Sequence, residues 1–267
     1  MREIQIDELK RIQLDIMQAV HDFCISQGIY YSLTYGTLIG AVRHHGYIPW
    51  DDDIDICMPR TDYDRFLKLF NQSQQRYKAM AYELDSDYPY TFAKVEDTNT
   101  RLIENADIHY DLGINIDIFP IDGADVSGKN LRRQVCYHWL MNFKCISLSA
   151  DRNGFKNLLL CIGKLILAPI SIKYILACMM KNAKSIPYNS TELVACVAFG
   201  SKENHPVPKS LFQQQILVPF EDREFYIMNG YREYLTSIFG DYLQLPPVEQ
   251  QISHHNFTAY CLDDGQK

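Results

Sequence analysis

The chain has 267 residues and a formal net charge of −7, with 47% hydrophobic and 22% charged residues. These proportions are typical of a globular protein with a substantial core, and they exclude an intrinsically disordered chain. The acidic balance argues against sequence-independent nucleic-acid binding, which needs an extended basic surface. We expect one elaborated domain and no nucleic-acid partner.

Apolar residues at helical spacing predict a first helix over 7–27, with Asp7 as its N-cap and Gly28 as its C-terminal stop. A short strand over 30–35 and a brief helix over 38–44 are predicted next.

The following stretch predicts a second strand over 53–58, and Thr61-x-x-Asp64 resembles the capping box of another helix. More short strands are predicted at 78–84, 91–95, 101–104, 114–119 and 193–199, and a helix is predicted at 231–243.

The stretch over 152–191 contains six basic residues and no acidic one. Lys164, Pro169 and Lys173 interrupt its apolar run, which predicts two short amphipathic helices meeting near Pro169 rather than a spanning helix. Two interpretations stay open. The helices cover the core of the domain, or their basic and apolar face lies on an anionic membrane surface.

The eight cysteines include no C-x-x-C pair, which favours buried free thiols in a reducing compartment over zinc ligands or disulfides. The first residues, MREIQIDELKRIQ, lack the continuous hydrophobic region of a signal peptide. The sequence therefore predicts a cytoplasmic protein, with possible peripheral contact at the cytoplasmic membrane.

A run of aspartates is the most informative feature of the sequence. Asp53 and Asp55 alternate with two isoleucines, so a strand would place both carboxylates on one face. Adjacent carboxylates repel one another unless a cation lies between them, and oxygen ligands suit Mg²⁺ or Mn²⁺. The pattern indicates a metal-dependent enzyme that acts on a phosphorylated donor.

Two other interpretations of the aspartates are weaker. A solvated acidic turn would not explain the alternation with apolar residues. A calcium loop would need glycine where Ile56 stands and glutamate where Asp62 stands.

Gly36 and Thr37, at a predicted strand-to-helix turn, offer backbone N–H groups to a phosphate. Together with the aspartates and an isolated strand aspartate, Asp117, they resemble the nucleotidyltransferase fold. The expected fold class is α/β (α+β), a mixed sheet flanked by helices with a helical insertion.

GTLIGAVRHHGYIPWDDDIDICMPRTDYDRF is similar to the signature of the LicD family of phosphotransferases, which is related to fukutin and fukutin-related proteins. FAKVEDTNTRLIE, DIFPIDG, PFEDREFY and YREYLTSIFGDYLQLPPVEQQISHH also resemble that family. The resemblance covers most of the chain and is thin between about 126 and 190. It suggests one catalytic domain with a core at 1–125, a basic helical insertion at 126–190 and a segment at 191–267 that closes the site.

The resemblance implies transfer of phosphocholine from CDP-choline to a hydroxyl of a cell-surface glycopolymer precursor, of the teichoic acid or lipopolysaccharide type, with release of CMP. Three alternatives remain open: transfer of ribitol phosphate or glycerol phosphate, a true nucleotidyltransferase, and a non-catalytic glycan- or nucleotide-binding module.

The resemblance also implies roles for the acidic residues. Asp53 and Asp55 would be metal ligands, and Asp117 would complete the site and accept the proton of the attacking hydroxyl. Asp51 and Asp52 would order the loop or bond an arginine.

Five further residues are candidates for binding the donor. Arg43 and Lys94 would contact the diphosphate, although a salt bridge from Arg43 to Asp51 or Asp52 is an equal alternative. Trp50 would stack on cytosine or enclose a quaternary ammonium, or else belong to the core. His44 would bind a donor phosphate or lie on the surface, and His254, a further donor-binding candidate, falls where the family pattern ends in a histidine.

Overall fold

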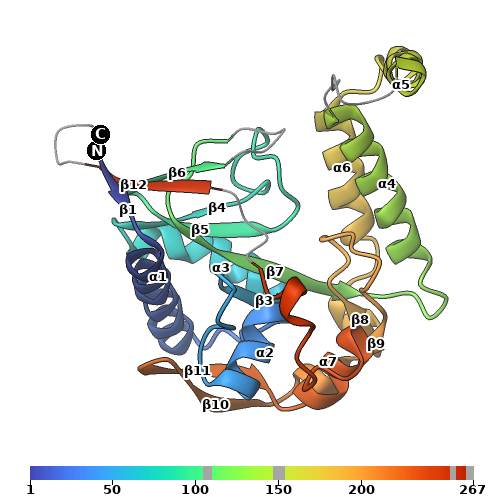
Figure 1. Ribbon diagram of the computed structural model, residues 1–267. Coiled ribbons are helices and arrows are strands. Elements are labelled where there is room, and N and C mark those ends of the chain that lie inside the picture. The colour runs from blue at the N-terminus through green and yellow to red at the C-terminus, as the bar shows by residue number, and fades with distance from the viewer. Residues whose placement is uncertain (105–109, 147–153, 253–256, 263–267) are drawn as a thin grey trace.

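A computed structural model describes residues 1–104, 110–146, 154–252 and 257–262. A mixed sheet lies at its centre, and a helical arm projects from one side (Figure 1). The mixed α/β fold confirms the predicted fold class. The main path of the sheet runs in the order β2 (Ser32–Leu33), β3 (Asp55–Pro59), β7 (Asn115–Gly123), β5 (Ala93–Asp97) and β4 (Tyr77–Met80).

β3 and β7 are parallel, whereas the other pairs of this path are antiparallel. The predicted strand over 53–58 begins only at Asp55, so Asp53 precedes it. The alternation still extends over the whole run, because Ile54 and Ile56 are buried while Asp53 and Asp55 are half-buried.

α1 (Ile6–Gln27), α2 (Tyr35–His44) and α3 (Arg60–Ser73) pack against the central strands. Gly28 ends α1 in the left-handed conformation, as predicted. Asp7 is not the N-cap, because the helix already begins at Ile6 and Gln5 takes that position.

The second and third helices also start earlier than predicted. α2 begins at Tyr35, which places Gly36 and Thr37 inside its first turn. α3 begins at Arg60 after Pro59, without a side-chain cap, so the capping box of Thr61 and Asp64 is wrong. Proline suits this position because its fixed φ directs the chain out of β3.

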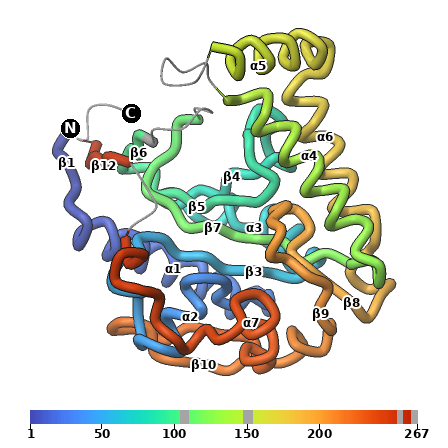
Figure 2. Tube along the Cα trace, turned by 45° about the vertical axis from the view of Figure 1, so that its right-hand side comes forward, coloured from blue at the N-terminus to red at the C-terminus, as the bar shows by residue number. Residues whose placement is uncertain are grey.

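The arm consists of α4 (Lys129–Cys145) and α6 (Ile172–Ala183), which pack together, and of α5 (Gly154–Ile166) across their far end (Figure 2). The predicted pair of short helices on either side of Pro169 is confirmed. Within the described residues, no helix is long and apolar enough to span a membrane.

Much of the C-terminal third of the chain lies along the lower edge of the molecule in Figure 1. Its last strand, Phe257–Cys261, pairs with the first strand of the chain, Arg2–Ile4. The strand predicted over 193–199 is limited to Leu193–Ala195, and the helix predicted over 231–243 ends at Phe239. The remaining elements are β1 (Arg2–Ile4), β6 (Thr100–Glu104), β8 (Leu193–Ala195), β9 (Val207–Pro208), β10 (Gln215–Phe220), β11 (Arg223–Met228), α7 (Tyr231–Phe239), β12 (Phe257–Cys261) and the 3-10 turns η1 (Tyr188–Ser190), η2 (Lys209–Phe212) and η3 (Val248–Gln250).

A buried ion-pair network joins α3, the end of β7 and the arm. The Arg60 guanidinium donates to both carboxylate oxygens of Asp122, at 2.7 and 2.9 Å. Arg60 also donates to Glu83 at 3.1 Å, and Glu83 pairs with Lys184 just after α6, at 3.0 Å. Asp122, the second aspartate of the DIFPIDG motif, therefore anchors the fold.

The cysteines are free, as predicted, but they are not uniformly buried. Cys24, Cys57 and Cys196 are buried, whereas Cys136 and Cys161 on the arm are exposed. Cys161 lies in an apolar run, a position typical of buried thiols, but most side chains of α5 are exposed.

Candidate active site

Three charged side chains lie in a row across three adjacent strands. Asp55 of β3 is directly opposite Asp117 of β7, and Asp117 is directly opposite Lys94 of β5. Because residues opposite one another in a sheet project from the same face, the two carboxylates and the ammonium form one continuous charged row. The register thus joins residues that are far apart in the sequence.

Lys94 is bound firmly into this row. Its Nζ donates to Asp117 Oδ1 at 2.6 Å and to Asn115 Oδ1 at 3.1 Å, and the residue is only 8% exposed. The ammonium thus offsets part of the negative charge of the carboxylates. The sequence suggested that Lys94 contacts the donor diphosphate. In the structure its ammonium is paired with the Asp117 carboxylate.

Asp55 lies in an electrostatically unfavourable environment. Burial raises the pKa of its carboxyl well above the ordinary value, and the charges of Asp53, Asp117 and Asp51 raise this pKa further, while Lys94 lowers it. The structure therefore brings Asp51, Asp53, Asp55 and Asp117 into one acidic cluster. A negatively charged substrate needs additional positive charge to enter it.

The first turn of α2 borders this cluster, as the sequence predicted. Thr37 Oγ1 accepts a hydrogen bond from the backbone N–H of Asp55 at 2.8 Å. A Cβ atom added at Gly36 would lie 2.8 Å from Asp51 Oδ2, so the glycine allows that carboxylate to approach the helix. Asp51 therefore lies against the turn that was expected to bind a phosphate.

The other end of α2 holds a second group of predicted residues. Arg43 donates from Nη1 to the Tyr242 carbonyl at 2.8 Å and from Nε to His44 Nε2 at 2.9 Å. Burial lowers the pKa of Arg43, and burial followed by the charge of Arg43 lowers that of His44. The Trp50 ring contacts the His44 ring edge to face, with centroids 6.4 Å apart.

The predicted salt bridge from Arg43 to Asp51 or Asp52 is wrong, because within the described chain the guanidinium bonds His44 and C-terminal carbonyls instead. Arg43 and Trp50 line a cleft of about 450 Å³ together with the segment over 239–247. None of the four clustered aspartates lines that cleft. His254 lies outside the described residues.

Gln13 is a structural residue of the site that the sequence did not reveal. Its Nε2 donates to the Asp52 carbonyl at 3.0 Å and to the Asn115 carbonyl at 3.4 Å. Gln13 thereby ties the aspartate loop to β7, beside a cavity of about 60 Å³ that Asp53, Lys94 and Asp117 also line. In the sequence, Gln13 is only a polar residue beside the apolar stripe of the first helix, which does not indicate this role.

Two C-terminal motifs support α2. The Glu221 carboxylate of PFEDREFY accepts from the Tyr47 backbone N–H at 2.9 Å. The Tyr234 hydroxyl of YREY lies 2.8 Å from Thr34 Oγ1, at the residue before α2. These segments hold both ends of the helix that borders the acidic cluster.

The cluster can be tested for its fit to a divalent cation. As they stand, no three His, Cys, Asp or Glu side chains of the described residues converge closely enough to ligate a metal ion. The chemistry of the donor set nevertheless suits Mg²⁺ or Mn²⁺, since its oxygens are anionic, half-buried and mutually repulsive. A small adjustment of side chains around a cation would relieve that repulsion.

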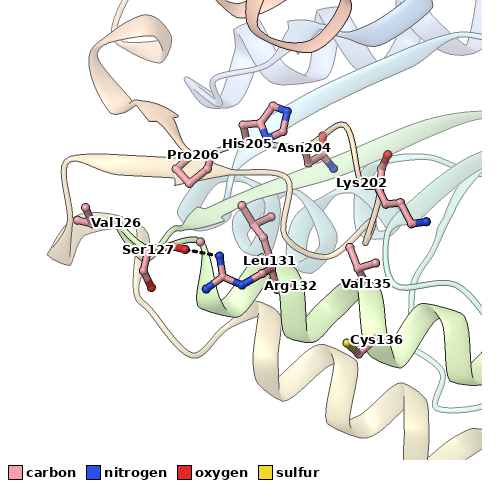
Figure 3. Close-up of a pocket in the computed structure, with 12 residues that line it drawn as sticks. Val126, Ser127, Leu131, Arg132, Val135, Cys136, Lys202, Asn204, His205 and Pro206 are labelled. Atoms are coloured by element: carbon pink, nitrogen blue, oxygen red, sulfur yellow. Dashed lines mark hydrogen bonds between the residues drawn. The ribbon is translucent and has the colours of Figure 1, made fainter.

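A larger cavity, of about 610 Å³, lies between α4 and the segment over 201–206 (Figure 3). Arg132, Lys202 and His205 line it, but none of the clustered aspartates does. It therefore lies apart from the residues of the acidic cluster.

Comparison with known proteins agrees with this geometry. A family model described as LicD/FKTN/FKRP, nucleotidyltransferase domain, matches residues 28–139, a range that includes Asp53, Asp55, Lys94 and Asp117. This part of the chain, which carries the acidic cluster, thus resembles a nucleotidyltransferase domain.

A match over the full length narrows the assignment. The chain is 32% identical over 273 residues to the lipopolysaccharide cholinephosphotransferase LicD of Haemophilus influenzae, which covers 98% of this chain and 100% of that relative. An uncharacterized protein of Rickettsia typhi is 37% identical over 75 residues, 28% of this chain and 24% of that protein. The chain belongs to the LicD family, and it is a transferase.

Proposed function

We propose that this protein transfers phosphocholine from CDP-choline to a hydroxyl group of a lipopolysaccharide and releases CMP. The observation that carries the proposal is the row of Asp55, Asp117 and Lys94 within a chain that matches a lipopolysaccharide cholinephosphotransferase from end to end. Catalysis of phosphoryl transfer depends mainly on positioning and charge neutralisation, which such a row can supply.

Mg²⁺ or Mn²⁺ is the proposed cofactor, and Asp53, Asp55 and Asp117 are its proposed ligands. When bound, the cation would neutralise phosphate charge beside the carboxylates. Asp51, next to Gly36, would help to order the loop that carries Asp53.

The protein's own side chains have distinct proposed tasks. Lys94 holds Asp117 in place and offers positive charge to the donor phosphates. Asp117 accepts the proton of the acceptor hydroxyl as that oxygen attacks phosphorus and the bond from phosphorus to the CMP oxygen breaks. The backbone of the first turn of α2 orients a phosphate oxygen.

The direct test is product analysis with CDP-choline, Mg²⁺ and a lipopolysaccharide acceptor. We expect free CMP and an acceptor that gains phosphocholine, and we expect Asp53→Asn to abolish both while the protein still melts cooperatively. Attachment of CMP to the acceptor with release of phosphocholine would instead indicate a true nucleotidyltransferase. Binding of donor without any turnover would indicate a binding module.

The donor and acceptor can be separated in the same assay. CDP-ribitol and CDP-glycerol replace CDP-choline in one arm, and a teichoic acid replaces lipopolysaccharide in the other. We expect CDP-choline and lipopolysaccharide to give the highest kcat/KM, as the name of the full-length relative suggests.

We also propose that α5 contacts the surface of an anionic membrane, where a lipid-linked acceptor would reside. The helix lies at the far end of the arm and exposes Leu158, Leu165 and Ile166 by 57%, 76% and 69%. Its described basic residues, Lys156 and Lys164, complement anionic lipid.

A further inference from the structure

A cluster of aromatic rings adjoins the charged row. Phe92, Phe119 and Phe199 contact one another, with centroids 4.5 Å apart for Phe92 and Phe119 and 5.0 Å apart for Phe119 and Phe199. Tyr35 contacts Phe119 at 5.2 Å, and Tyr90 contacts Phe92 at 5.6 Å. We call these five residues the aromatic wall.

The pleat of the sheet places the wall on the same face as the charged row. Phe119 follows Asp117 by two residues on β7, and Phe92 precedes Lys94 by two residues beside the neighbouring strand. Side chains two residues apart in extended chain project from the same face. The wall is therefore a direct continuation of the row along the sheet.

The wall already attracts a cation. Lys94 Nζ lies 5.3 Å from the centroid of Tyr90 and 5.6 Å from that of Phe92. Phe119 is buried, but Tyr35, Tyr90, Phe92 and Phe199 are only half-buried and keep part of their surface accessible. Accessible aromatic faces next to carboxylates form a surface of the kind that binds organic cations.

The backbone of Tyr35 shows that this arrangement has an energetic cost. Its φ is 46°, in the left-handed region that a residue with a Cβ atom rarely adopts. Such a conformation persists only where the surroundings hold it. Here the Tyr35 ring is held between Phe119 and Phe199, and its hydroxyl donates to Asn204.

We propose that the aromatic wall binds the trimethylammonium group of phosphocholine, a specificity that rests on the proposed function. This group cannot donate hydrogen bonds, so aromatic faces and nearby negative charge are what can recognise it. The short ethylene linker of phosphocholine requires the ammonium site to adjoin the phosphate site, and the wall meets this condition. Ribitol and glycerol need hydrogen-bond partners that phenylalanine rings do not offer.

The aromatic wall takes the role that the sequence suggested for Trp50, which is to enclose the quaternary ammonium. The Trp50 ring contacts His44 at the opposite end of α2 from Tyr35, and Trp50 lines the cleft beside the C-terminal segment. The tryptophan therefore belongs to a different surface from the rings beside Asp117 and Lys94.

The test compares CDP-choline with its uncharged isostere, CDP-3,3-dimethylbutanol, in which carbon replaces the quaternary nitrogen. We expect the unaltered protein to favour CDP-choline in kcat/KM by roughly tenfold, the size of a cation–π contribution. Phe199→Leu should reduce this ratio to about twofold by raising the KM for CDP-choline, while turnover of the isostere changes little.

Trp139→Leu on the exposed face of α4 is the matched control and should keep the full ratio. Tyr90→Leu provides a second variant of the wall if Phe199→Leu fails to fold. An unchanged ratio in a folded variant of the wall would overturn the inference and leave the proposed function intact. No release of CMP from CDP-choline by the unaltered protein would overturn both.

Discussion

At the scale of single residues, Asp55, a proposed metal ligand, shows how a residue of the acidic cluster opposes stability. Its carboxyl is surrounded by three other carboxylates, and burial adds to the cost of its negative charge. Residues at functional sites commonly retain such unfavourable interactions because ligands compensate for them. The acidic cluster should therefore destabilise the protein when no cation is bound.

We predict that Asp55→Asn raises the melting temperature at pH 7.5 without divalent cations, while it abolishes CMP release. The gain should be a few degrees, since about 1 kcal/mol shifts the melting temperature of a chain of this size by roughly 2–4 °C. Because the pKa of Asp55 is higher in the folded than in the unfolded protein, the unaltered protein loses stability as pH rises from the ordinary value of 3.8 through the folded pKa.

The difference in melting temperature between Asp55→Asn and the unaltered protein should therefore vanish below that ordinary pKa and grow toward neutral pH. Scanning calorimetry between pH 3.5 and about 8 measures it. Adding Mg²⁺ should stabilise only the unaltered protein. A variant that is less stable at every pH would contradict the electrostatic account.

Lys94→Met tests the contribution of the ammonium in the charged row. We predict that kcat falls by about 10²–10³, the usual effect of removing one preorganised charge from a transition state. Lys78→Met on the neighbouring strand β4 is the control, since Lys78 is exposed and should leave kcat unchanged. Steady-state CMP release measures kcat for both variants. If Lys94→Met released CMP as fast as the unaltered protein, Lys94 would be excluded from the site.

At the scale of elements, the ion pair of Arg60 and Asp122 fastens α3 to the end of β7. Both side chains are almost fully buried, and the pair is bidentate. Removing one partner of a buried pair leaves an unpaired charge in a region of low dielectric constant. Asp117 lies on the same strand, five residues before Asp122.

We predict that Arg60→Met lowers the free energy of unfolding by about 3–5 kcal/mol. Arg65→Met, which removes an exposed pair with Asp62, should cost less than about 1 kcal/mol. Urea denaturation followed by circular dichroism provides both values. The double variant Arg60→Met/Asp122→Leu should recover part of the loss, and failure to do so would argue against an unpaired Asp122 charge as the cause.

At the scale of the whole molecule, the arm separates an exposed apolar helix from the acidic cluster. The net charge of −7 would repel the protein from anionic lipid, whereas the stretch over 152–191 contains only basic charges. Such a distribution favours one orientation on a membrane, with the arm toward the surface. The catalytic face would then remain free to bind a water-soluble donor.

We predict that the protein sediments with vesicles containing phosphatidylserine at low salt and is released at high salt, because screening weakens the attraction. Leu158→Glu/Leu165→Glu should abolish sedimentation without changing cooperative melting. Leu84→Glu, at an apolar residue 47% exposed outside the arm, is the control. Equal sedimentation with neutral and anionic vesicles would contradict this orientation.

The local features of this protein can be predicted from its sequence alone. Alternation placed Asp53 and Asp55 opposite buried isoleucines, and the left-handed end of the first helix followed from Gly28. The pair of helices around Pro169 was equally visible. These features depend on neighbours within a few residues, where period, turn chemistry and proline geometry are decisive.

Contacts between residues that are distant in the sequence became visible only in the folded structure. The register of β3, β7 and β5 brought Asp55, Asp117 and Lys94 together and placed Phe92 and Phe119 beside them. It also assigned Arg43 to the C-terminal segment rather than to the aspartates. The physical reason is that strand pairing and packing are set by the whole core, so a residue's partner across the sheet cannot be inferred from its own neighbours in sequence.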